Sequence, residues 1–71
     1  MLVTGDIRVI PQGKVKELSL CQVWQKGNLV VGADKDTQVY LLARCVDKQS
    51  AYGRVRRIAE STNKNRVHRL H

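Results

Sequence analysis

The basic side chains in the last third of this chain are its residues best suited to chemistry. From residue 48 to residue 71 there are seven lysines and arginines against a single acid, Glu60, which accounts for +6 of the formal net charge of +7. The preceding 47 residues hold six bases and five acids and are nearly neutral. Charge separated in this way attracts polyanions to one end of a molecule, and nucleic acid is the commonest polyanion in a cell. A solvated basic surface without a dedicated partner is the alternative interpretation.

Arginine makes up five of these seven bases. A guanidinium binds phosphate through two parallel hydrogen bonds and also stacks on bases, so arginine indicates nucleic acid more strongly than charge alone. We therefore predict a surface that binds DNA or RNA, with these contacts from the basic region: Lys48, Arg54, Arg56, Arg57, Lys64, Arg66 and Arg69. Because arginine is also enriched in protein interfaces, the alternative is a small protein-binding module or inhibitor that uses the same arginines against an acidic partner protein.

Aromatic rings could add base stacking to this surface, worth about 1 to 3 kcal/mol per base. Tyr40 lies on the polar side of its predicted strand together with Gln38 and Arg44, and we include Tyr40 and Arg44 among the candidate contacts. Burial in the core is the alternative for Tyr40. Trp24 is expected to be a core residue, because tryptophan is highly buried on average.

Catalytic and metal-binding patterns are weak in this sequence. The only histidines, His68 and His71, lie near its end, and no serine or cysteine has a base at a recognisable spacing. Two histidines three residues apart, without a neighbouring cysteine or acid, are a poor indication of a metal site. The glycines do not form a phosphate-binding loop. We predict a non-enzymatic protein without metal or cofactor.

A length of 71 residues allows one small domain with a thin hydrophobic core. The chain has no phenylalanine, so the core must come from aliphatic residues, with Trp24, Tyr40 and Tyr52 as its only large rings. Cys21 and Cys45 allow at most one disulfide, and we expect both to be reduced core residues in a cytoplasmic protein. Small domains of this kind are often oligomeric, so a homo-oligomer is expected. No apolar run is long enough for a membrane span.

The first half of the chain has the pattern of short strands. Residues 2–10 alternate apolar and polar side chains, and a turn is predicted at 11–13. Residues 15–25 are compatible with a strand or a helix, but the short connection at 26–28 favours a strand, because it suits a β-hairpin. Residues 37–46 have the clearest strand pattern, with four apolar side chains expected on one face: Val39, Leu41, Ala43 and Cys45.

A helix is predicted to begin after Asp47, whose carboxylate can accept hydrogen bonds from the free amides of a first turn, and to end by Asn63. Its apolar stripe consists of Ala51, Val55, Ile58, Ala59 and Thr62. The basic residues flank this stripe, with Arg54, Arg57 and Ser61 on one side and Lys48, Arg56 and Asn63 on the other.

These elements predict an α+β fold, a small antiparallel β-meander of three or four strands followed by one C-terminal helix and a basic tail. Residues 1–63 would form the domain and 64–71 the tail. The tail is expected to be too short to pack and to order against a polyanion. A cloning remnant or disordered end, or packing on the sheet through Val67 and Leu70, are the alternatives. Because residues 2–10 open the meander, we expect them to form the exposed edge at which copies of the chain associate.

Overall fold

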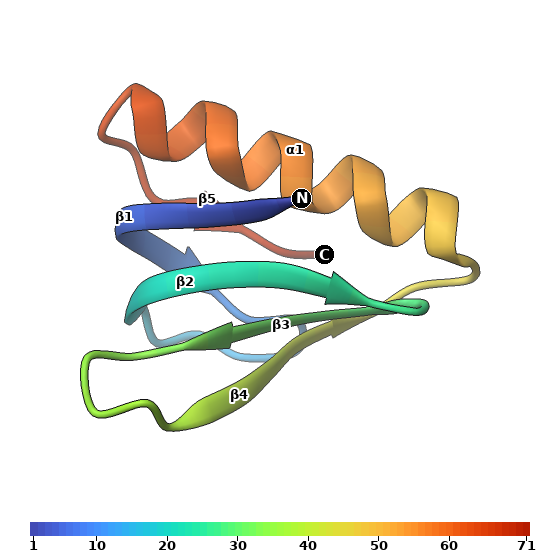
Figure 1. Ribbon diagram of the computed structural model, residues 1–71, viewed down its shortest axis with the longest axis horizontal. Coiled ribbons are helices and arrows are strands. Elements are labelled where there is room, and N and C mark those ends of the chain that lie inside the picture. The colour runs from blue at the N-terminus through green and yellow to red at the C-terminus, as the bar shows by residue number, and fades with distance from the viewer.

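The computed structural model describes the whole chain from Met1 to His71 and confirms the α+β fold. Its elements, in chain order, are β1 (Leu2–Ile10), β2 (Leu18–Lys26), β3 (Leu29–Ala33), β4 (Val39–Arg44), α1 (Lys48–Asn63) and β5 (His68–Arg69). The strands form one curled sheet in the order β4-β3-β2-β1-β5. Neighbouring strands are antiparallel, except that β5 runs parallel to β1. Helix α1 lies across one face of the sheet, above β1 and β5 (Figure 1).

Residues 15–25, whose pattern is compatible with a strand or a helix, contribute to the strand β2. β2 pairs with β1 on one side and with β3 on the other. The β2–β3 hairpin closes between Lys26 and Leu29, and Gly27 adopts a φ of +61° in the turn. Glycine adopts a positive φ without steric cost, so it suits a short connection between two antiparallel strands. The pairing of β2 with β3 on both sides of this turn shows that the preceding residues form a strand and not a helix.

Two bulges decide which side chains enter the core. The β1–β2 register shifts between Thr4 and Ile7, and the β3–β4 register shifts between Val30 and Val31. In and just after β4 the predicted apolar face is therefore wrong for Val39 and Leu41, which are exposed, and confirmed for Ala43 and Cys45, which are buried. Leu41 is 53% exposed, whereas Leu42 is 1% exposed and Ala43 is also buried. One inserted residue reverses the side of the sheet to which the preceding side chains point.

The core is aliphatic and contains no fully buried aromatic ring. It consists of 13 residues, from β1 to β4, from α1 and from two positions outside these elements, Cys45 and Leu70, and it includes the predicted helix positions Ala51, Val55 and Ile58. Trp24 is only partly buried and lies outside this cluster, so its assignment to the core is wrong. Alternation along β2 explains this, because Val23 is buried and Gln25 bonds the backbone of Lys48 in α1. Trp24 therefore points to the opposite face.

Both cysteines are free, as predicted, but only Cys45 is in the core. Cys21 is exposed. β2 breaks its alternation at this point, since Cys21 and Gln22 are both exposed while Leu20 and Val23 are both buried.

Helix α1 begins and ends where the sequence predicts. The Asp47 side chain accepts a hydrogen bond of 2.8 Å from the amide of Ser50. At the other end Asn65 takes a φ of +56°, and the amide of Arg66 donates to the carbonyl of Ser61. Asparagine is tolerated in this left-handed conformation, which satisfies the last carbonyls of a helix and reverses the chain.

The tail packs on the domain, so the expectation that it is too short to pack is wrong. Val9 and Ile10 of β1 pair with His68 and Arg69 of β5. Leu70 is only 3% exposed and belongs to the core cluster. The left-handed turn after α1 supplies the reason, because it directs the chain back along β1. β1 is consequently covered by β5 at Val9 and Ile10, and there its assignment as the sheet edge is wrong.

Gln12 connects the two edges of the curled sheet. Its backbone amide donates to the carbonyl of Leu42, and its side-chain oxygen accepts from the amide of Arg44, both in β4. Its side-chain nitrogen donates to the carbonyl of His71, just after β5. Some backbone amides and carbonyls at both edges of the sheet therefore have hydrogen-bond partners within one chain, which weakens the case for association through open strands.

Helix α1 has neither the length nor the apolar composition needed to cross a membrane.

Candidate nucleic-acid interface

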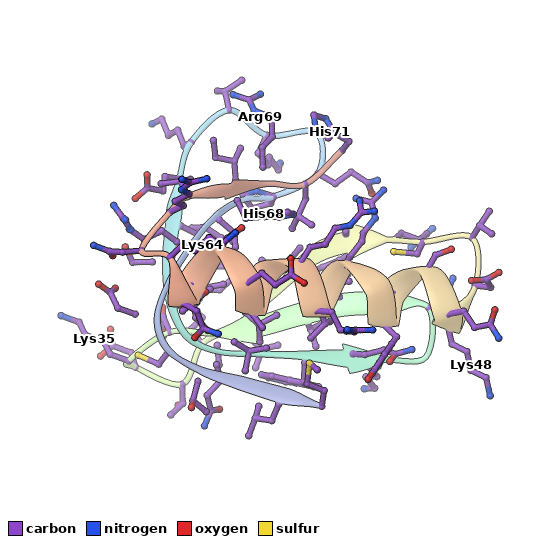
Figure 2. All side chains as sticks on the ribbon, turned by 90° about the horizontal axis from the view of Figure 1, so that it is seen from above. Lys35, Lys48, Lys64, His68, Arg69 and His71 are labelled. Atoms are coloured by element: carbon purple, nitrogen blue, oxygen red, sulfur yellow. The ribbon has the colours of Figure 1, made fainter.

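One flank of α1 faces β5. Arg54, Arg57 and Ser61 are spaced by three and four residues and therefore lie on the same side of the helix. Ser61 makes a hydrogen bond of 3.1 Å between its Oγ and Nδ1 of His68 in β5. Looking down on the helix, Figure 2 shows β5 running beside α1, with His68 at this junction. The fold therefore brings two arginines of the helix and a histidine of the tail to one surface.

A second row of side chains runs along the flank of α1 on the other side of its apolar stripe from Arg54 and Arg57. Lys48, Tyr52 and Arg56 are separated by four residues each, so they stand one above another on consecutive turns. Tyr52 is 43% exposed and does not belong to the core. Tyr52 follows Ala51 in the sequence but does not belong to the predicted apolar stripe. This position could have identified it as an exposed aromatic residue. An exposed ring between two bases can stack on a nucleobase.

The basic residues of the tail extend this surface beyond α1. Lys64, Arg66 and Arg69 are all exposed. In Figure 2, Lys64 lies at the C-terminal end of the helix, Lys48 lies at the other end, and Arg69 lies on the far side of β5 from α1. We refer to α1 and β5 with these bases as the basic surface.

Carboxylates do little to neutralise the basic surface. No lysine or arginine side chain in the molecule donates a hydrogen bond to an acid; Arg8 alone donates, to the carbonyl and side-chain oxygens of Asn65 at 2.8 and 3.3 Å. Glu60, the one acid after residue 47, borders a shallow depression on α1 together with Arg56 and Arg57. The charge of the remaining bases is therefore available to an external anion.

The pKa of His68 is lowered below 6.5, its ordinary value. Partial burial of the ring is the largest cause, followed by the positive charges of Arg57 and Arg54 and by His71. Burial and neighbouring cations both disfavour the charged imidazolium. At neutral pH His68 is therefore an uncharged group beside two guanidinium groups.

Tyr40 and Arg44 lie on β4 and not on α1 or in the tail. Arg44 is connected to the chain end, because Gln12 accepts from the Arg44 amide and donates to the carbonyl of His71. The Tyr40 hydroxyl donates to Oδ2 of Asp34 at 3.1 Å, and this bond is the largest cause that raises the pKa of Tyr40. Hydrogen bonds to the Asp34 carboxylate, above all from the amide of Gln38, lower the pKa of that acid and keep it charged. A ring held by a carboxylate is poorly placed for a polyanion.

The sheet face opposite α1 carries a row of apolar side chains. In the strand register Leu2 lies opposite Trp24, Trp24 opposite Val31, and Val31 opposite Leu41, so the row crosses four strands. We call these four residues the apolar row. Leu2 and Leu41 are both more than half exposed. Leu41 also borders a groove of about 440 Å³ with Pro11, Lys14, Val15, Lys16, Leu18 and Tyr40.

Comparison of the chain with protein-family models, with curated proteins and with solved structures gives no match.

Proposed function

We propose that this protein is a small non-enzymatic regulator in the cytoplasm that binds DNA or RNA through its basic surface. The observation that carries the proposal is the collection of unneutralised bases along α1 and β5, opposite in the fold to the apolar row. Phosphate contacts from arginine and lysine supply most of the affinity of nucleic-acid binding proteins. Tyr52 adds a ring that can stack on a base, while Tyr40, whose hydroxyl is bound to Asp34, is not part of this proposed surface.

The contact between Ser61 and His68 does not change this proposal to an enzyme. A serine nucleophile needs a histidine base that is itself oriented by a third group, commonly a carboxylate. Here Ser61 contacts Nδ1, and arginines are the charged groups that act on the ring. Cations beside the histidine lower its basicity, which is the opposite of what a general base requires.

Electrophoretic mobility shift tests the proposal directly. Duplex DNA, single-stranded DNA and RNA would each be titrated with the protein at low and moderate salt. We expect retarded complexes at low salt whose affinity falls as salt rises, because binding to phosphates releases condensed counterions. Absence of any complex at low salt with all three probes would refute the proposed function.

Paired substitutions assign the binding to the basic surface. Arg54→Ala/Arg57→Ala should weaken binding and reduce the magnitude of the slope of log K against log salt by about one to two, because up to two phosphate contacts are lost. The matched control is Lys16→Ala/Lys35→Ala, which removes the same charge from two exposed loop positions. Circular dichroism checks that both variants keep the fold. Equal weakening by the two variants would mean that net charge, and not this surface, governs binding.

An acidic protein partner is the alternative ligand for the same arginines. A polyanionic peptide, such as polyglutamate, included as a competitor in the mobility shift distinguishes the two. Displacement of nucleic acid at a much lower concentration of peptide carboxylates than of competing nucleotide phosphates would favour the acidic protein.

We further propose that two copies of the chain associate through their apolar rows. Leu2 and Leu41 of the row are more than half exposed on the face that α1 leaves uncovered, and a core without a buried aromatic ring gains from additional apolar burial. This geometry also places the two basic surfaces on outer sides of the dimer, where their positive charges are kept apart. Gln12 already bonds backbone groups at both edges of the sheet, so we expect association through the apolar row and not through pairing of edge strands.

Sedimentation equilibrium in the micromolar range tests the dimer. The wild type should exceed the mass of one chain, 8.1 kDa, and Leu41→Asp should reduce it to that mass. Val46→Asp is the control, because Val46 is an almost fully exposed aliphatic residue in the connection between β4 and α1. A wild type of 8.1 kDa over the whole range would exclude the dimer.

A further inference from the structure

His68 occupies an unusual position for a histidine on a cationic surface. This residue of β5 is partly buried against α1, where its Nδ1 contacts Oγ of Ser61 at 3.1 Å. Arg54 and Arg57 lie on the same flank of the helix as Ser61, and their charges reach the ring. The Nε2 atom has no hydrogen-bond partner within the chain. The ring can therefore offer Nε2 to a ligand while Ser61 holds Nδ1.

Every charged group that faces His68 from the elements around it is basic. Helix α1 contributes Arg54 and Arg57, and the chain end contributes His71. On the adjacent strand β1, Arg8 is bound to Asn65 and is not among the charges that act on the ring. None of the causes that act on the His68 pKa is a carboxylate. An anion at this position would therefore be the first negative charge in contact with the ring.

The hydroxyl of Ser61 suits both charge states of the ring. It can donate to Nδ1 when the imidazole is neutral and accept from Nδ1–H when the imidazole is protonated. The contact with Ser61 therefore does not have to break when His68 gains a proton. A protonated ring would present Nε2–H as a third donor beside two guanidinium groups, an arrangement that matches the oxygens of a phosphate.

We propose that Arg54, Arg57 and His68 form one phosphate-binding site, and that His68 takes up a proton from the solvent when a phosphate binds there. This inference rests on the proposed function, since it assigns one nucleic-acid phosphate to a particular place on the basic surface. It adds a proton to the binding reaction. Because His68 is neutral in the free protein at neutral pH and charged in the complex, the affinity increases as the pH falls through the range in which the two states differ.

Fluorescence anisotropy with a labelled oligothymidylate, whose bases do not titrate at weakly acidic pH, measures this coupling. Between about pH 7.5 and 5.5 the wild-type affinity should rise by up to about tenfold per pH unit, the limit for uptake of one proton. His68→Gln should abolish most of this rise, because glutamine keeps a polar side chain but cannot gain a charge. His71→Gln, which changes the other histidine of the same chain end, should retain it.

Nuclear magnetic resonance of the wild type tests the site without depending on any variant. The Hε1 shift of His68 is followed against pH in chloride and in inorganic phosphate at equal ionic strength. Phosphate should raise the pKa of His68 more than that of His71. An unchanged His68 titration in phosphate and in oligonucleotide, or a pH dependence that survives in His68→Gln, would overturn the site.

Two further comparisons separate this inference from the proposed function and identify the source of the phosphate. If the wild type binds no oligonucleotide but phosphate shifts His68, the site stands and the nucleic-acid proposal fails. If binding occurs without pH dependence, the nucleic-acid proposal stands and the site fails. Oligothymidylates with and without a 5′-phosphate distinguish a terminal phosphate from the phosphodiester backbone. Equal affinities assign the site to the backbone.

Discussion

Single residues determine how this protein responds to pH. The lowered pKa of His68 means that the unfolded chain, whose histidine titrates at 6.5, binds more protons than the folded chain in the window just below 6.5. Stability then increases with pH through that window and falls on acidification. The lowered pKa values of Asp34 and Asp47 act in a separate window below 3.8, where protonation removes their hydrogen bonds to backbone amides.

We predict that the melting temperature is lower at about pH 5.5 than at about pH 7.5, and that His68→Gln reduces this difference. The reason is that glutamine cannot take up the proton that the unfolded wild type gains. Scanning calorimetry without nucleic acid or phosphate measures the effect. His71→Gln serves as the comparison, and a pH difference as large in His68→Gln as in the wild type would contradict the assignment.

A second prediction at this scale concerns Tyr52. Tyr52→Ala should weaken binding to single-stranded nucleic acid by about 1 to 3 kcal/mol, because a base loses its stacking partner. Tyr52→Phe should bind almost as the wild type does, since the ring is retained. Anisotropy titrations of the three proteins provide the measurement. Equal loss in the alanine and phenylalanine variants would indicate a role for the hydroxyl and not for stacking.

At the scale of elements, α1 contains a residue that the fold does not require. A Cβ atom added at Gly53 would meet no other atom within 4 Å, and Gly53 is not among the glycines with positive φ. Glycine at this position is therefore not needed for a close approach of α1 to a strand.

We predict that Gly53→Ala raises the free energy of unfolding by about 0.4 to 1 kcal/mol, because alanine restricts the unfolded chain and favours the helix. Urea denaturation followed by circular dichroism measures this change. No stabilisation would contradict the conclusion that the fold does not require glycine at position 53.

The C-terminal segment 64–71 has a structural role and, in the proposed function, a binding role, and different residues carry them. Leu70 is buried in the core, whereas Lys64, Arg66 and Arg69 are exposed. Removal of residues 64–71 would therefore abolish both roles together and could not separate them. Substitutions can.

We predict that Leu70→Ala lowers the free energy of unfolding by about 2 to 5 kcal/mol, as expected for a cavity in a core. Lys64→Ala/Arg66→Ala/Arg69→Ala should instead keep the melting temperature close to that of the wild type and weaken nucleic-acid binding. Thermal melts and mobility shifts of both variants provide the test. A triple variant that binds like the wild type would remove the tail from the basic surface.

At the scale of the whole molecule, charge is distributed unevenly over the two faces. The bases follow α1 and β5 on one side, and the apolar row crosses the sheet on the other. The two faces therefore suit different partners, a polyanion and a second copy of the chain, which could be bound at the same time.

We predict that log K for duplex DNA falls against log salt with a slope of about −3 to −4, because about four of the seven bases can reach phosphates together. Binding measured at several salt concentrations supplies the slope. A slope near zero would contradict electrostatic binding, and a slope much steeper than this would indicate that two copies contact the same duplex.

The sequence alone determined the elements and their local chemistry. Alternation, the glycine of the β2–β3 turn and the carboxylate of Asp47 act over a few residues, so the four main strands, the hairpin, the limits of α1 and its buried stripe could all be predicted. The charge separation behind the proposed function could also be read directly, because it is a property of composition along the chain.

Only the tertiary structure decided the faces and the neighbours. A one-residue bulge reverses the side to which β4 sends its side chains, and no short pattern marks where the bulge falls. Asn65 turns the tail so that Leu70 enters the core, which also brings His68 to Ser61 and the arginines of α1. These contacts join residues distant along the chain, and they depend on the packing of several elements at once, so local periodicity could not reveal them.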